Sequence, residues 1–220
     1  MKRGRGLPTF LLSATPPGAR SLSRHAAAAR LGIAYDSLVK LIRAGILDEP
    51  LHPAAVDVLA TRHWLTARTG ELTVLRTDGP PTVDAPTRRP FGFAVDVTDD
   101  YLADAALGPW RSDPERVERN QLLAVVLSTV PVAVYDIDRR GPAELDTRGH
   151  PRYTYSGTLL ARLGPSSLGS RRGEAPTDSA GNAVIIKNPD LPVADPRITT
   201  AEIIMHSRIR VDSRGPIGYL

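Results

Sequence analysis

Acidic residues in the second half of the chain are placed where they could hold a divalent metal ion. Asp136 and Asp138 alternate on one face of a predicted strand, and Lys187 on a later strand could complete a nuclease-like set. Three further aspartates surround the end of one predicted strand and the start of a predicted helix: Asp96, Asp99 and Asp100. The alternative is structural, because aspartates stabilise helix N-termini and Asp138, followed by two arginines, suits an exposed turn.

Other catalytic signatures are absent from the sequence. A zinc site needs histidines and carboxylates at ligand spacing, but the five histidines are scattered. They are His25, His52, His63, His150 and His206. The glycines of residues 164–173 lack the Gly-Lys-Ser/Thr that binds nucleotide phosphates, and without cysteine there are no disulfides or thiolate ligands. The sequence therefore predicts no metal and no cofactor and favours a non-enzymatic function, with a small magnesium-dependent nuclease as an alternative.

Two short helical patterns meet at a glycine within residues 22–47, and these are the most informative elements of the chain. Ser23 can cap the first helix, whose alanines strongly favour helix, and Gly32 marks the break. A second helix is predicted over 34–44 from leucines and an isoleucine at helical spacing, and Gly45 can take the left-handed conformation that stops it. Two helices joined in this way have the layout of a helix-turn-helix.

The second helix of a DNA-binding helix-turn-helix enters the major groove, with its first residues at base edges and basic residues at phosphates. Three residues are therefore expected to face bases: Tyr35, Asp36 and Ser37. Four basic residues are expected to contact phosphates: Arg24, Arg30, Lys40 and Arg43. Because a single helix-turn-helix buries little interface, we expect self-association, at least as a dimer on double-stranded DNA.

The stretch RHAAAARLGIAYDSLVKLIRAGIL resembles the excisionase and MerR-type winged helix-turn-helix family. In that family an alanine-rich helix, a Leu-Gly-Ile/Val turn and a recognition helix ending in LIRAGIL are followed by a short helix, which would here occupy residues 52–62. The resemblance covers roughly residues 20–66 and implies a DNA-binding regulator or a recruitment factor on mobile-element or phage-like DNA. The alternative is a small helical domain that packs on a protein partner.

Basic charge is concentrated in the first third of this 220-residue chain. Residues 1–70 carry ten Lys and Arg against four Asp and Glu, whereas residues 71–220 carry eighteen against twenty. A cationic segment attached to a helix-turn-helix attracts polyphosphate by releasing counterions, and residues 1–5 could add non-specific affinity. The alternative is compositional, because 25 arginines beside three lysines are typical of a GC-rich genome.

Hydrophobic periodicity changes from helical to alternating near residue 70, where we place a domain boundary. Residues 1–20 are expected to be a flexible basic arm, 21–70 the helix-turn-helix domain and 71–220 a β-rich domain. Strands are predicted over 72–77, 91–97, 122–127, 131–137, 153–159, 183–187 and 201–211. Short helices are predicted over 99–107 and 114–121, capped by Thr98 or Asp99 and by Asp113, and a long polar loop is predicted over 164–182.

Residues 107–160 resemble the small PUA/EVE-like β-barrel domains. The shared features are a Trp-x-x-x-Pro-x-Arg helix, a hairpin ending in a Val-Tyr strand, and a later strand with aromatic residues and a glycine. The resemblance implies that an aromatic pocket binds a nucleic-acid strand or a flipped, modified base. Its candidate residues are Trp110, Tyr135, Tyr153 and Tyr155. The alternative is that these large side chains fill the core of the β-rich domain.

The sequence as a whole predicts an α+β protein, with an N-terminal helix-turn-helix followed by a β-rich domain that is either barrel-like or an open sheet and carries a few short helices. We expect a cytoplasmic protein without contact to a membrane, because the longest apolar run, residues 122–135, is too short to span a bilayer. The expected function is DNA binding, with ligand or nucleic-acid reading by the β-rich domain. An alternative is a defence- or mobile-element-associated adaptor that reads modified nucleic acid.

Overall fold

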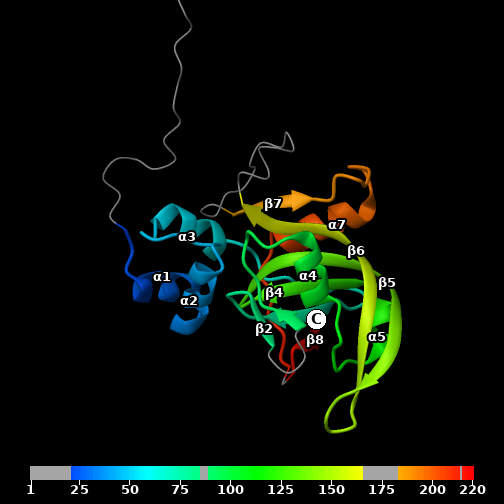
Figure 1. Ribbon diagram of the computed structural model, residues 1–220. Helices are drawn as coiled ribbons and strands as arrows, with labels where there is room; N and C mark the ends of the chain where they lie inside the picture. Colours follow the sequence, from blue (N-terminus) through cyan, green and yellow to red (C-terminus); the bar gives the residue numbers. More distant parts are fainter. Residues whose placement is uncertain (1–20, 85–88, 166–182, 214) are drawn as a thin grey trace, which may run out of the picture.

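The computed structural model of the protein describes residues 21–84, 89–165, 183–213 and 215–220. These residues form an α+β fold in which three N-terminal helices lie beside a mixed six-stranded sheet (Figure 1). The expected arm over 1–20 and most of the expected polar loop over 164–182 lie outside the described residues. Within the described part of the chain, no helix is both long enough and apolar enough to cross a membrane.

The three predicted N-terminal helices are present, and their ends follow local chemistry. They are α1 (Arg24–Leu31), α2 (Tyr35–Arg43) and α3 (Pro53–Ala60). The Ser23 hydroxyl accepts a hydrogen bond from the Ala26 amide, as an N-cap should. Gly32 and Gly45 have φ of +63° and +73°, the left-handed conformation that was predicted for Gly45 and that also forms the break at Gly32. Small and branched apolar side chains fill the space between the helices: Ala27, Ala28, Leu31, Leu38, Leu41, Val56 and Leu59.

The sheet has the strand order β7-β6-β5-β4-β1-β8, so the pairing is that of an open sheet with β7 and β8 at its edges. Its strands are β1 (Thr73–Thr77), β4 (Leu122–Leu127), β5 (Val130–Leu145), β6 (Pro151–Pro165), β7 (Ala183–Lys187) and β8 (Ile217–Tyr219). Strands β1 and β4 are parallel, and the other neighbours are antiparallel. Strand β5 extends well beyond its predicted segment, because its residues after Ile137 are mostly exposed and carry no alternating apolar signal. Strand β6 extends beyond both ends of its predicted segment, and its residues 160–164 are buried.

Three helices pack around the sheet: α4 (Asp99–Ala106), α5 (Pro114–Asn120) and α7 (Pro196–Met205). Helices α4 and α5 begin where they were predicted to begin, because Thr98 and Asp113 each accept a hydrogen bond from a first-turn amide. Helix α7 lies along β5, β6 and β7, and α5 lies beside β4 and β5 (Figure 1). These helices cover the apolar side chains of the central strands.

The strand predicted over residues 91–97 is wrong. Only β3 (Arg89–Phe91) is a strand there, paired with β2 (Thr82–Asp84), and the following residues form an irregular segment. Phe93, Ala94 and Val95 are all buried, so the segment does not alternate between core and solvent. The backbone amides of this segment donate to carbonyls outside the sheet and not to a neighbouring strand. The Phe93 amide, for example, donates to the Asp78 carbonyl at 2.7 Å.

The strand predicted over residues 201–211 is also wrong, because its first half belongs to α7. Asp195 caps this helix by accepting from the Arg197 amide, and Pro196 occupies its first position, where a missing N–H costs nothing. Residues Ile198, Ala201, Ile204 and Met205 are buried at helical spacing. The β-branched residues in this stretch favoured strand locally, but packing on the sheet and the cap at its start stabilise a helix.

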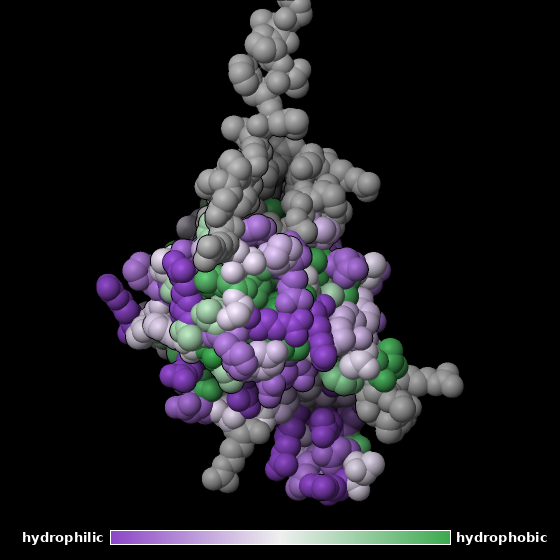
Figure 2. Space-filling view, turned by 90° about the vertical axis from the view of Figure 1, so that its left-hand side faces the viewer, coloured by the Kyte–Doolittle hydropathy of each residue, from purple (hydrophilic) through white to green (hydrophobic). Residues whose placement is uncertain are grey.

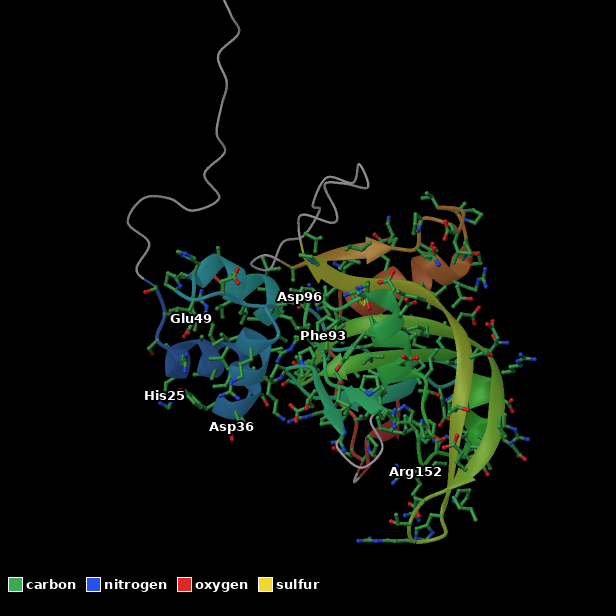
Figure 3. The ribbon with its side chains drawn as sticks, viewed as in Figure 1. His25, Asp36, Glu49, Phe93, Asp96 and Arg152 are labelled. Carbon is green, nitrogen blue, oxygen red and sulfur yellow. The ribbon has the colours of Figure 1, made fainter. Side chains whose placement is uncertain are left out.

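The helical group and the sheet share one continuous apolar core. The amide of Val95 donates to the Ala44 carbonyl at 2.9 Å, just after α2, and the buried Arg208 guanidinium donates to the Leu31 carbonyl at 2.6 Å, at the end of α1. Phe93 is completely buried at the boundary between the two parts (Figure 3). The orientation of α1 and α2 relative to the sheet is therefore fixed by buried contacts.

A buried arginine secures the irregular segment after β3. Arg162 on β6 is only 3% exposed, and its three guanidinium nitrogens donate to the carbonyls of Val95 and Leu163 and to the Asp99 carboxylate, the last at 2.6 Å. The charge is therefore compensated, while the two carbonyls gain donors that water cannot reach.

Replacing Arg162 with Met should lower the free energy of unfolding by about 2 kcal/mol, because two buried carbonyls lose their donors. Urea denaturation followed by circular dichroism measures this change. Arg139→Met is the matched control, because Arg139 is exposed on the neighbouring β5 and should change stability by less than about 0.5 kcal/mol. Equal losses in the two variants would contradict a stabilising role for Arg162.

Candidate functional site

Helix α2 presents one narrow face to solvent. Tyr35, Asp36 and Arg43 are exposed on this face, and Asp36 points away from the sheet (Figure 3). Ser37 is half-buried, because the hydroxyl of Ser128 in the β4–β5 turn lies 3.4 Å from its carbonyl oxygen. The three residues expected at bases are therefore adjacent, but only Tyr35 and Asp36 are fully on the open face.

Three of the four basic residues expected at phosphates are engaged in ion pairs. Arg24 makes a bidentate pair with Glu49, with both distances at 2.7 Å. Arg30 pairs with Asp57 of α3. Lys40 lies 3.1 Å from a carboxylate oxygen of Asp78, across the boundary with the sheet. Arg43 alone among the four has no ion pair with a described residue.

Cations and carboxylates are intermixed on this part of the surface. The face of the molecule that carries α1–α3 shows hydrophilic side chains interspersed with small apolar patches (Figure 2). Of the six Lys and Arg in residues 21–70, three are paired as described, and four acidic residues lie in the same range. The other four basic residues of the first third belong to residues 1–20, outside the described part of the chain.

The ion pairs change the titration of their acidic members. The Arg24 guanidinium hydrogen-bonds Glu49 and holds the pKa of that carboxyl below its usual range. Arg116 of α5 lowers the pKa of Glu71 in the same way. The pKa of Asp146 is lowered chiefly by the backbone amide of His150, with a smaller contribution from Arg152. All three carboxylates are therefore charged throughout the physiological range.

The four aromatic residues expected to line a pocket do not come together at one cavity. Tyr135 is only 1% exposed within the sheet, and burial raises its pKa. Tyr155 is also buried, and its hydroxyl lies 2.6 Å from that of Ser112. Tyr153 is half-buried and exchanges two 2.9 Å backbone hydrogen bonds with Trp110. Among the four, Trp110 alone lines a cavity that lies beside the β2–β3 hairpin.

That cavity has a volume of about 760 Å³ and lies between the β2–β3 hairpin, the end of α4 and the long β5–β6 hairpin. Phe91 and Trp110 give it two aromatic surfaces. The guanidinium of Arg89 stacks over the Trp110 ring at 3.9 Å from the centroid, and one of its nitrogens donates to the Pro109 carbonyl at 2.9 Å. The indole N–H of Trp110 donates to the Ala106 carbonyl, so the ring is held on both sides.

Three basic and three acidic side chains line the cavity. The cations are Arg76, Arg89 and Arg152, and the anions are Asp78, Glu144 and Asp146. Arg152 and Asp146 pair at 3.3 Å on the β5–β6 hairpin, and Arg152 lies near its tip (Figure 3). Apart from Trp110, none of these residues was singled out from the sequence. The nearest sequence signal is the density of prolines over residues 78–90, which favours a linker or a surface loop but does not indicate its position against α4 and β5.

Two of the aspartates considered for metal binding, and the lysine considered with them, interact with charged side chains of the protein. Asp136 accepts a hydrogen bond from Arg197 at 2.8 Å, and Asp99 pairs with the buried Arg162. Lys187 lies 3.9 Å from Glu202 of α7. Among the described residues, no group of three or more histidines, aspartates or glutamates could hold a metal ion.

Comparisons of the chain with protein-family models, with curated proteins and with solved structures find no match. Its function is therefore inferred from the geometry of its own residues.

The ion pair between Arg24 and Glu49 predicts a specific dependence of stability on pH. Because the folded-state pKa of Glu49 is lowered, its contribution to stability is present above the unfolded-state pKa and is lost as pH falls through the folded-state pKa. Glu49→Gln should therefore be less stable than the parent at neutral pH, and the difference should vanish once the pH has fallen below the folded-state pKa of Glu49. Urea denaturation at several pH values measures it, and a difference that persists in acid would contradict the assignment to ionised Glu49.

Proposed function

We propose that the protein binds duplex DNA through the three N-terminal helices, with α2 as the element that enters the major groove. The observation that carries this proposal is the outward face of α2, which presents Tyr35, Asp36 and Arg43 on a helix held rigidly from behind. The preceding helix, the left-handed Gly32 and the short third helix agree with a helix-turn-helix. In this proposal Tyr35 and Asp36 face bases and Arg43 contacts a phosphate.

The amides at the start of α2 support contact with an anion. Ala34 occupies the N-cap position and supplies no side-chain hydrogen bond to them. In a groove, such amides can donate hydrogen bonds to a phosphate oxygen at the positive end of the helix dipole.

The ion pairs of Arg24, Arg30 and Lys40 are compatible with phosphate contact. The paired side chains are between 39% and 50% exposed. Exposed pairs of this kind contribute little to stability, typically less than about 1 kcal/mol, so a phosphate can replace the carboxylate at small cost. Each exchange returns a carboxylate to solvent, and the expected salt dependence is therefore shallower than the number of basic residues suggests.

Two substitutions should change DNA binding by the full chain in opposite directions. Arg43→Ala should reduce the slope of log affinity against log salt by about one unit, because one phosphate contact is lost. Asp78→Asn should raise affinity, because it releases Lys40 while the amide oxygen can still accept from the Gly79 amide. Fluorescence anisotropy with a labelled duplex over a range of salt concentrations measures both effects.

Arg139→Ala, which removes an exposed arginine from β5, is the control for non-specific charge. An unchanged salt slope in Arg43→Ala would place α2 away from the phosphates. Unchanged affinity in Asp78→Asn would mean that Lys40 makes no phosphate contact.

A second candidate function is favoured by the cavity beside Trp110, which suits a planar ligand such as an exposed, modified nucleobase. Phe91 and Trp110 offer stacking surfaces, and the lining supplies both donors and acceptors without an excess of either charge. An adaptor that reads modified nucleic acid would use this cavity and need not recognise a duplex through α2.

Fluorescence of Trp110 tests the second candidate directly. In a Trp64→Phe chain, Trp110 is the sole tryptophan, and a single-stranded oligonucleotide should quench it. Phe91→Ala should weaken this binding about tenfold, the effect of one lost stacking contact. Val83→Ala, exposed on the adjacent β2, is the matched control. Quenching that is the same in all three chains would exclude base stacking in the cavity.

A further inference from the structure

Three arginines, one on β1 and two in the segment between α7 and β8, lie near the N-terminal helices, and none of them has an ion pair with a carboxylate among the described residues. The cluster consists of Arg76 on β1, Arg208 and Arg210, together with the indole of Trp64. The guanidinium carbons of Arg208 and Arg210 lie 4.3 and 5.9 Å from the centroid of the Trp64 ring. Arg76 and Arg210 also line a shallow groove of about 130 Å³ whose wall includes Ser128 and Thr129. We call this surface the arginine groove.

The partners of these arginines are neutral. Arg76 donates to the carbonyls of Ser213 and Gly215, and Arg208 donates to the carbonyl of Leu31. Burial and the neighbouring charge of Arg210 both lower the pKa of Arg208. The positive charge of the arginine groove is therefore uncompensated by described residues, in contrast to the paired cations of α1 and α2.

The arginine groove adjoins α2, the helix proposed to enter the major groove of DNA. Ser128, in its wall, approaches the carbonyl of Ser37 on α2 at 3.4 Å, and Arg208 contacts the last residue of α1. The groove therefore lies close to the start of α2 and to the end of α1.

We propose that the arginine groove binds the phosphodiester backbone of a nucleic acid as a second contact surface beside α2. Guanidinium groups match phosphate oxygens in geometry as well as charge, and Arg210 is exposed and available for such a pair. Trp64 is 48% exposed, so a sugar or base next to the phosphate can pack on its ring. The inference rests on the proposed nucleic-acid binding but concerns residues outside the three helices.

Arg210→Ala in the full chain should reduce the salt slope of duplex binding by about one unit, with Arg139→Ala as the control. Arg210→Lys should retain most of the slope, since the charge remains. In a Trp110→Phe chain, Trp64 is the sole tryptophan, and addition of the duplex should change its fluorescence emission. Adding the Arg210→Ala substitution to this chain should abolish the change. Thermal melting establishes that each variant is folded.

The outcomes separate this inference from the proposed function. A reduced slope in Arg43→Ala with an unchanged slope in Arg210→Ala overturns the inference and leaves α2 as the contact. An unchanged slope in Arg43→Ala with a reduced slope in Arg210→Ala supports phosphate binding by the arginine groove and contradicts phosphate contact by α2. Competition by polyglutamate as effective as that by unlabelled duplex overturns the assignment to phosphodiesters. Failure of the parent to bind at about 50 mM salt overturns both.

Discussion

The docking of α2 against the sheet is the contact on which the arrangement of the candidate sites depends. Leu38 and Leu41 point into the shared core, and the Ala44 carbonyl just beyond the helix accepts from the Val95 amide. The ion pair of Lys40 and Asp78 lies along the same boundary. Because packed cores and buried hydrogen bonds resist deformation, only the opposite face of α2 remains free to contact a partner. The boundary that fixes the helix therefore also selects which of its residues can function.

The same docking redistributes charge over the surface. Basic residues of α1 and α2 lie within reach of carboxylates from α3, from the loop after α2 and from the end of β1, and they pair with them. Arg208 and Arg210, by contrast, are brought beside Trp64 and away from described acidic partners. Local electrostatic potential depends on these pairings more than on the net charge of a segment. Arginines without a described carboxylate partner therefore lie in the segment after α7 as well as on α2.

The cavity and the arginine groove are neighbours, since Arg76 lines both. Asp78 likewise lines the cavity and pairs with Lys40 of α2. The segment at the end of β1 therefore contacts all three surfaces to which we assign a binding role. A ligand in the cavity that engaged Asp78 would compete with Lys40, so occupancy of one surface can change the charge presented by another.

The sequence by itself determined the elements whose signals are local. Caps at Ser23, Thr98 and Asp113, turns at Gly32 and Gly45, and the two strands of the central hairpin were all predicted, because each depends on a few neighbouring residues. Tertiary structure decided the rest. The β-branched stretch of α7 is a helix and not a strand, and residues 92–97 lie outside the sheet. Tyr135 and Tyr155 are buried in the core, whereas Phe91 and Arg89 lie beside Trp110 at the cavity. These outcomes depend on contacts between residues far apart in the chain, and neither periodicity nor local propensity encodes which distant partner satisfies a buried donor or charge.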